Sequence, residues 1–259
     1  AAAEAVSIGN YAAGDTMGMF GSSNSIITLT STYTRSRTFW GLNWLFPDQY
    51  AVVGGMATVG SLTKWFLENI YTPDSEASDQ NPYAQMAELL NMSVPGANNL
   101  VALPYFEGER TPINDPLARG AFFGLTLRHT QADLYRALLE AVGFGIRHNL
   151  ESLADQGILV KFINAVGGGS KNQGWMQIIA NIAGVDVRIP QGNSGASYGD
   201  AILAGIGVGV YENASQARIW DEAALVLKPD KTDKETYKRL YQVYHELYER
   251  TKPLLPLLS

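Results

Sequence analysis

Residues 159–183 read LVKFINAVGGGSKNQGWMQIIANIA, a stretch in which three local patterns follow one another. Residues 159–166 form an apolar run typical of a buried strand, and residues 175–183 have the apolar spacing of a helix. Between them lies the turn GGGSKN at residues 167–172, where three missing Cβ atoms let another group approach the backbone closely. A strand that enters a helix through such a turn is typical of α/β proteins.

Strands and helices continue to alternate on the carboxyl-terminal side of this stretch, and a long helix precedes it. Residues 185–189 predict a strand, and residues 197–208 predict a helix rich in small residues. The long amphipathic helix follows the capping-box sequence TQAD at residues 130–133. A second capping box at residues 232–235 predicts the last helix, which carries tyrosines on one face.

The first part of the chain predicts an antiparallel meander. Apolar or β-branched residues flank the turn GSSN at residues 21–24, which is the pattern of a hairpin. The further expected elements are strands at 38–44 and 50–53, a helix at 61–70, a loop at 72–81 and a short helix at 82–90. Residues 94–119 hold four prolines, so we expect an extended surface excursion there. Together the elements predict an α/β fold, a mixed sheet with helices on both faces.

The composition excludes several classes of protein. Of 259 residues, 46% are hydrophobic and 17% are charged, which provides a core and is unlike a disordered chain. Because cysteine is absent, thiolate metal sites and cysteine nucleophiles are excluded. The net charge of -6 offers no basic field for nucleic acid, and no apolar run reaches the roughly 20 residues of a membrane helix. We therefore expect a cytoplasmic protein that binds neither nucleic acid nor membrane.

The two glycine-containing turns are the candidate binding sites. A helix that starts after residues 167–172 directs free N–H groups and a partial positive charge into that turn, which suits a nucleotide or another anion. The turn has neither Walker A nor GxGxxG spacing, so a plain strand-to-helix connection is the alternative. The hydroxyl and N–H groups of residues 21–24 suit phosphate oxygens in the same way, or serve the hairpin alone.

The histidines and most acidic side chains favour structural roles. His129, His148 and His245 share no metal-binding spacing, and surface or capping positions explain them better. There is no GxSxG elbow, so the sequence indicates no serine nucleophile. Asp133 occupies a capping position, which accounts for its carboxylate better than catalysis does.

Several segments, in this order, resemble the carboxyl-terminal domain of the FGGY family of carbohydrate kinases. GAFFGLTLRHTQADLYRALLE at residues 120–140 resembles a signature of that family, and GERTPINDP at residues 108–116 resembles its xylulokinase-type members. GGGSKN is similar to the adenosine motif of the family, and GSS at residues 21–23 is similar to its second phosphate loop. GDA at residues 199–201 stands where many members have Gly-Ala-Ala.

The resemblance implies an actin-like, ribonuclease-H-like fold in which the whole chain, residues 1–259, is the ATP-binding domain. It implies that Gly21, Ser22 and Ser23 contact the terminal phosphates of ATP. The other positions that it places beside the nucleotide are Gly60 and Lys64, at the start of a helix, and Gly168, Gly169 and Asn172, around the adenosine. ATP and Mg²⁺ are the implied cofactors, and no metal site made by the protein is expected.

The function implied is the ATP-binding half of a sugar or polyol kinase, with a ketopentose such as xylulose favoured as the substrate. The catalytic aspartate of the family is expected immediately upstream of Ala1, and the sugar-binding amino-terminal domain lies outside this chain. We therefore expect the chain alone to be inactive, and its uncapped first helix to be covered by that domain or by a second copy in a homodimer. The alternative is a non-catalytic actin-like module that binds nucleotide or a partner. An acyl-phosphate-forming kinase of the same superfamily finds no support in these motifs.

Overall fold

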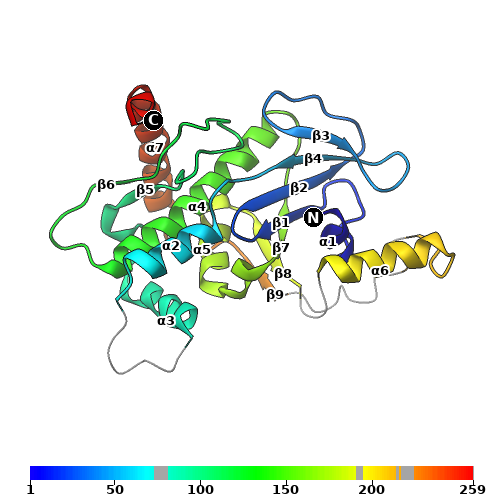
Figure 1. Ribbon diagram of the computed structural model, residues 1–259, viewed down its shortest axis with the longest axis horizontal. Helices are drawn as coiled ribbons and strands as arrows, with labels where there is room; N and C mark the ends of the chain where they lie inside the picture. Colours follow the sequence, from blue (N-terminus) through cyan, green and yellow to red (C-terminus); the bar gives the residue numbers. More distant parts are fainter. Residues whose placement is uncertain (73–80, 191–194, 214–215, 217–224, 259) are drawn as a thin grey trace.

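The computed structural model describes residues 1–72, 81–190, 195–213, 216 and 225–258. Within them, the main sheet has seven strands in the order β3-β4-β2-β1-β7-β8-β9 (Figure 1). These strands are β1 (Thr16–Phe20), β2 (Asn24–Thr30), β3 (Trp40–Asn43), β4 (Tyr50–Gly54), β7 (Phe162–Val166), β8 (Asp186–Ile189) and β9 (Leu225–Leu227). A two-stranded sheet pairs β5 (Val101–Leu103) with β6 (Ala121–Phe123).

Helices lie on both sides of the main sheet. They are α1 (Ala2–Ser7), α2 (Gly60–Asn69), α3 (Pro82–Leu89), α4 (Gln131–Ala154), α5 (Gln173–Ala183), α6 (Ala196–Gly207) and α7 (Lys234–Thr251). Short 3₁₀ turns occur at Leu90–Met92, Ala97–Asn99, Gly168–Lys171 and Lys252–Leu258. None of the helices in the described part of the chain is both long enough and apolar enough to cross a membrane.

The sheet is mixed, as the sequence predicts, because β1 pairs antiparallel with β2 and parallel with β7. Successive strand residues face opposite sides of a sheet. On one face, Phe20 and Ile26 belong to a large core that α2, α4, α5 and α7 complete. On the other face, Met17 and Ile27 pack with Ala5 of α1, and α6 lies against α1 (Figure 1). The prediction of helices on both faces is therefore confirmed.

The local signals that set the helix ends are largely confirmed. The Thr130 N–H donates to the Asp133 carboxylate over 2.9 Å, so the capping box of α4 forms as predicted. Gly184 takes a left-handed conformation, with φ of 71°, and ends α5. The last helix buries the tyrosines of its predicted face, Tyr237, Tyr241, Tyr244 and Tyr248.

Three expectations are wrong. Residues 94–119 are not a surface excursion, because they include β5, whose three residues are buried against α4 and α7. The second capping box does not form: the Thr232 hydroxyl donates to Asp230 over 2.6 Å, and α7 begins after Asp233. His148 and His245 are partly buried and face each other between α4 and α7, with ring centroids 4.2 Å apart. The predicted loop at 72–81 falls mainly outside the described residues.

Candidate functional site

The turn between β1 and β2 is fastened to the start of α2. The Gly60 N–H donates to the Gly21 carbonyl over 2.9 Å, and the Val59 and Ser61 N–H groups donate to the Ser22 carbonyl over 2.9 and 3.0 Å. A Cβ on Gly60 would lie 2.4 Å from the Gly21 oxygen, so this close approach requires glycine. The first amides of α2 therefore satisfy the carbonyls of the turn, and the positive end of the helix dipole lies against it.

The glycine-rich turn after β7 reaches the same edge of the sheet. Because β1 and β7 are parallel, both strands end at this edge, where α/β proteins commonly bind ligands. A Cβ on Gly167 would lie 2.6 Å from the Phe20 carbonyl oxygen, so the turn passes directly over the end of β1. The two candidate turns, which are about 145 residues apart in the sequence, are thus neighbours in the fold.

The three residues of this turn that are expected around adenosine have different surroundings. A Cβ on Gly168 would meet no atom within 4 Å, so its face is open. A Cβ on Gly169 would lie 3.0 Å from Phe20 Cβ and 3.1 Å from Trp175 Cζ3, so its face is turned into the protein. Asn172 caps α5 by accepting a hydrogen bond from the Trp175 N–H over 3.0 Å. Of the three residues expected around adenosine, Gly168 alone has a Cβ direction that leads into open space.

The polar side chains of the site are only partly brought together. Ser22 is exposed and Ser23 is half-buried at the tip of the hairpin, and among the described residues their hydroxyls make no hydrogen bond. Lys64 lies one helical turn after Gly60, on the same face of α2. Its ammonium is 3.7 Å from the Glu68 carboxylate, so it pairs along the helix and not with the turn.

The segment GERTPINDP at residues 108–116 also reaches the turn. The Arg110 guanidinium donates to the carbonyl of Asn24, the first residue after the turn, over 2.7 Å. Beside it, the Glu109 carboxylate is buried and accepts from the Ala57 N–H over 2.7 Å. Burial raises the pKa of Glu109 to about 7, although the hydrogen bonds from Ala57 and Arg110 act in the opposite direction. The signal available in the sequence was the GERTP segment at residues 108–112, in which Glu109 and Arg110 are adjacent and of opposite charge.

The acidic residues of the signature helix hold neighbouring loops. The Asp133 carboxylate accepts from the Ser93 hydroxyl over 2.6 Å and from the Asn98 amide over 2.8 Å. Glu140 accepts from the Gly96 N–H over 2.9 Å, and burial raises its pKa to about 7. Residues 96–99 all have positive φ, so these carboxylates support an unusual left-handed turn rather than the glycine-lined edge.

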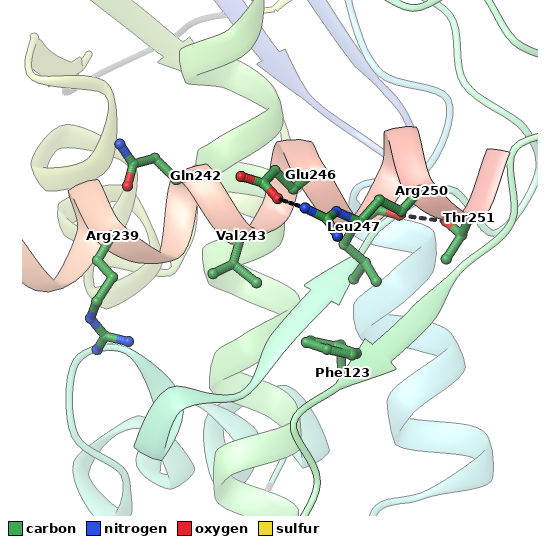
Figure 2. Close-up of a pocket in the computed structure, with 8 residues that line it drawn as sticks. All are labelled: Phe123, Arg239, Gln242, Val243, Glu246, Leu247, Arg250 and Thr251. Atoms are coloured by element: carbon green, nitrogen blue, oxygen red, sulfur yellow. Dashed lines mark hydrogen bonds and ion pairs between the residues drawn. The ribbon is translucent and has the colours of Figure 1, made fainter.

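A hollow lies between α7 and β6, away from the candidate turns. Figure 2 shows Val243, Leu247 and Phe123 at its apolar centre, with Arg239 and Arg250 toward its ends. Arg250 pairs with Glu246 over 2.6 Å, and Arg239 donates to the Asn99 amide oxygen over the same distance. None of the candidate nucleotide-binding residues lines this hollow.

Comparison with known proteins identifies the fold and the family. The model of the FGGY family of carbohydrate kinases, C-terminal domain, matches residues 16–208. The chain is 30% identical to a xylulose kinase of Staphylococcus epidermidis over 213 residues. These residues are 82% of this chain and 42% of that protein. A glycerol kinase of Citrifermentans bemidjiense is 34% identical over 181 residues, which are 68% of this chain and 35% of that protein. The chain thus spans less than half of these relatives.

A solved structure agrees with the sequence relatives. The xylulose kinase of Rhodospirillum rubrum superposes with a TM-score of 0.84 and 32% identity, covering 98% of this chain and 50% of that one. The expected actin-like α/β fold is therefore confirmed. With the family match over residues 16–208, the chain belongs to the FGGY family of carbohydrate kinases, as a carboxyl-terminal domain.

Proposed function

We propose that this chain is the ATP-binding half of a kinase that transfers the γ-phosphate of ATP to a carbohydrate hydroxyl. The observation that carries the proposal is the meeting of three segments at one sheet edge: the turn at residues 21–23, the start of α2 at Gly60 and the turn at residues 167–172. Membership of the FGGY family supplies the reaction class.

The residues present fit a nucleotide. The open face of Gly168 leaves room for a flat adenosine group against the backbone. Gly169 lets the turn pack closely on Phe20 and Trp175, and Asn172 joins the turn to α5 as its cap. The unpaired hydroxyls of Ser22 and Ser23 suit phosphate oxygens, and the dipole of α2 favours negative charge near Gly21. Lys64, whose side chain is 64% exposed, would exchange Glu68 for a phosphate oxygen.

ATP and Mg²⁺ supply the reacting group and the metal charge, and the chain positions them. ATP supplies the transferable phosphoryl group, and Mg²⁺ neutralises charge on the phosphate oxygens. Among the described residues, no cluster of three or more histidine or acidic side chains is placed to hold a metal ion. We therefore propose that Mg²⁺ binds through the phosphates, while the chain positions them by hydrogen bonds.

The substrate and the partner domain follow from the relatives. Several relatives are named xylulose kinases, which favours xylulose, a ketopentose, as the substrate. Because one relative is named a glycerol kinase, a polyol is the alternative substrate. The relatives extend well beyond the matched region, and we propose that the sugar and the general base are held by an amino-terminal domain of that kind. Pairing of two copies as a homodimer is a separate proposal, tested by the mass of the particle in solution.

Calorimetry with a non-hydrolysable ATP analogue and Mg²⁺ tests nucleotide binding by the 259-residue chain. We expect saturable binding that Gly168→Val weakens by about 10-fold, because a branched side chain would fill the open face. Gly207→Val, which also enters open space but lies at the far end of α6, serves as the control and should leave affinity within about 2-fold. Absence of binding, or equal affinity of Gly168→Val and wild type, would contradict the proposal.

A further inference from the structure

Arg110 joins two backbone segments that frame the turn at residues 21–23. Its guanidinium donates to the Asn24 carbonyl, which follows the turn, and to the Met56 carbonyl, which precedes α2. The Asn24 N–H itself donates to the Met56 carbonyl over 3.0 Å. A single planar guanidinium thus holds the exit of the turn against the segment that leads to Gly60.

The residues on each side of Arg110 fasten the same segment. The Glu109 carboxylate accepts from the Ala57 N–H, and the Thr111 hydroxyl accepts from the Gly55 N–H over 2.6 Å. Thr111 also donates to the Asn149 amide oxygen over 2.6 Å, and Asn149 is fully buried on α4. Residues 109–111 therefore connect the long central helix to the backbone of residues 55–57.

That backbone leads directly to the amides that hold the turn. Two residues after Ala57, the N–H groups of Val59, Gly60 and Ser61 bond to the carbonyls of Gly21 and Ser22. With Arg110 on Asn24, the turn is held at its beginning, through α2, and at its end, through the guanidinium. Arg110 is half-buried, and the attraction of its positive charge for the buried Glu109 carboxylate beside it opposes the rise that burial causes in the pKa of Glu109.

We propose that Arg110 is a positioning residue for the nucleotide phosphates: it fixes the hairpin turn whose hydroxyls and N–H groups bind them, without touching the nucleotide itself. The inference rests on the proposed function of this turn. The proposed role of Arg110 differs from that of the residues expected around adenosine. Its guanidinium donates to Asn24 and Met56 and not to the glycine-rich turn at residues 167–172. Loss of Arg110 should therefore affect the binding of phosphates and spare the binding of adenosine.

The experiment compares Arg110→Gln and Arg110→Lys with Arg119→Gln. Arg119 is a matched control in the same segment, where it donates only to the nearby carbonyls of Pro116 and Ala118. Calorimetry measures the affinity of each folded variant for adenosine and for the non-hydrolysable ATP analogue with Mg²⁺. In both Arg110 variants we expect the analogue to bind about 10-fold more weakly and adenosine to bind within about 2-fold of wild type. Hydrogen exchange of residues 21–25 should be faster in them than in Arg119→Gln.

The outcomes separate this inference from the proposed function. If wild type binds neither ligand, the proposed function fails and the inference fails with it. If wild type binds both, an equal loss for adenosine and analogue would show a general structural role and overturn the inference, as would unchanged affinity for both. Arg110→Lys keeps the charge and removes only the planar fork, so it provides the comparison if Arg110→Gln does not fold.

Discussion

Gly168 and Gly169 are adjacent, yet a side chain added to each would meet different surroundings. At Gly168 the Cβ direction is open, whereas at Gly169 it leads between Phe20 and Trp175, which are 1% and 2% exposed. Residues this well buried have little room to move. Two adjacent glycines of one turn thus differ in whether another group can approach them.

We predict that Gly169→Val lowers the free energy of unfolding by about 1–3 kcal/mol through overpacking. Gly168→Val should change it by less than about 1 kcal/mol, since it contacts nothing within 4 Å. Urea denaturation of the two variants and wild type measures both values. Equal stability of all three proteins would show that Phe20 and Trp175 move aside for the valine side chain without a cost in free energy. Weak nucleotide binding by Gly169→Val is therefore not evidence of contact with adenosine.

At the level of the elements, α1 and α6 approach each other closely at Gly199 of α6. A Cβ on Gly199 would lie 1.7 Å from the Ala3 carbonyl oxygen, which is far inside contact distance. Val6 packs against Ile202 of α6 at this contact, whereas Ala5 packs against the sheet, and both are fully buried. The expectation that α1 begins without a side-chain cap is confirmed, but its apolar residues are covered by this chain itself.

We predict that Gly199→Ala separates α1 from α6 and lowers stability by about 1–3 kcal/mol. Gly207→Ala in the same helix meets no atom within 4 Å and should be neutral or stabilise by up to about 1 kcal/mol, because alanine is the better helix former. Hydrogen exchange of residues 2–8 should accelerate only in Gly199→Ala. Similar behaviour of the two variants would mean that the helices adjust without cost.

The contact between α4 and α7 predicts a response to pH. Burial, then the neighbouring charge of His245, lowers the pKa of His148 to about 4, while Glu151 acts in the opposite direction. The unfolded chain therefore binds this proton below about pH 6.5 and the folded chain only below about pH 4. Stability should fall as the pH is lowered through this window, because protons favour the unfolded state.

We predict that the stability difference between wild type and His148→Gln changes by about 2–3 kcal/mol between pH 6.5 and pH 4, with wild type losing more. The glutamine has a similar size and does not titrate. Urea denaturation at several pH values gives the difference directly. A difference that stays constant across the window would show that His148 charges as easily in the folded chain as in the unfolded one.

At the scale of the whole molecule, the sheet ties distant parts of the chain together. The pairing of β1 with β7 places residues 17–19 beside residues 164–166. This pairing joins the four strands of the first part of the chain to the three strands of its later part. The large core draws residues from Phe20 to Leu255 into one cluster. No position in the described chain separates two independent cores of comparable size.

We therefore predict one cooperative unfolding transition for the chain. Helix circular dichroism and tryptophan fluorescence, which includes the buried Trp175 and the half-exposed Trp40, should give the same midpoint. A nucleotide at 100 times its dissociation constant should raise the free energy of unfolding by about 2.7 kcal/mol. Two separated transitions would contradict the assignment of residues 1–259 to one domain.

Local chemistry made much of this fold predictable from the sequence. The hairpin over residues 21–24, the capping box of α4 and the stop at Gly184 each depend on a few neighbouring residues. The glycine-lined turns were recognisable for the same reason, because glycine marks positions where a backbone must bend or approach another group. β5 was missed, since its three apolar residues lie among prolines, glycines and asparagines that predict a loop.

What the tertiary structure alone decided is which distant atoms meet. The contact of Gly60 with Gly21, the burial of the Gly169 face against Trp175 and the reach of Arg110 to Asn24, across 86 residues, leave no periodic trace in the sequence. Such contacts arise only when strand pairing brings the ends of β1 and β7 to one sheet edge and the core packs around them. Local residue patterns are enough to predict most elements and the turns between them, whereas long-range packing sets which glycine faces open space and which arginine holds the turn.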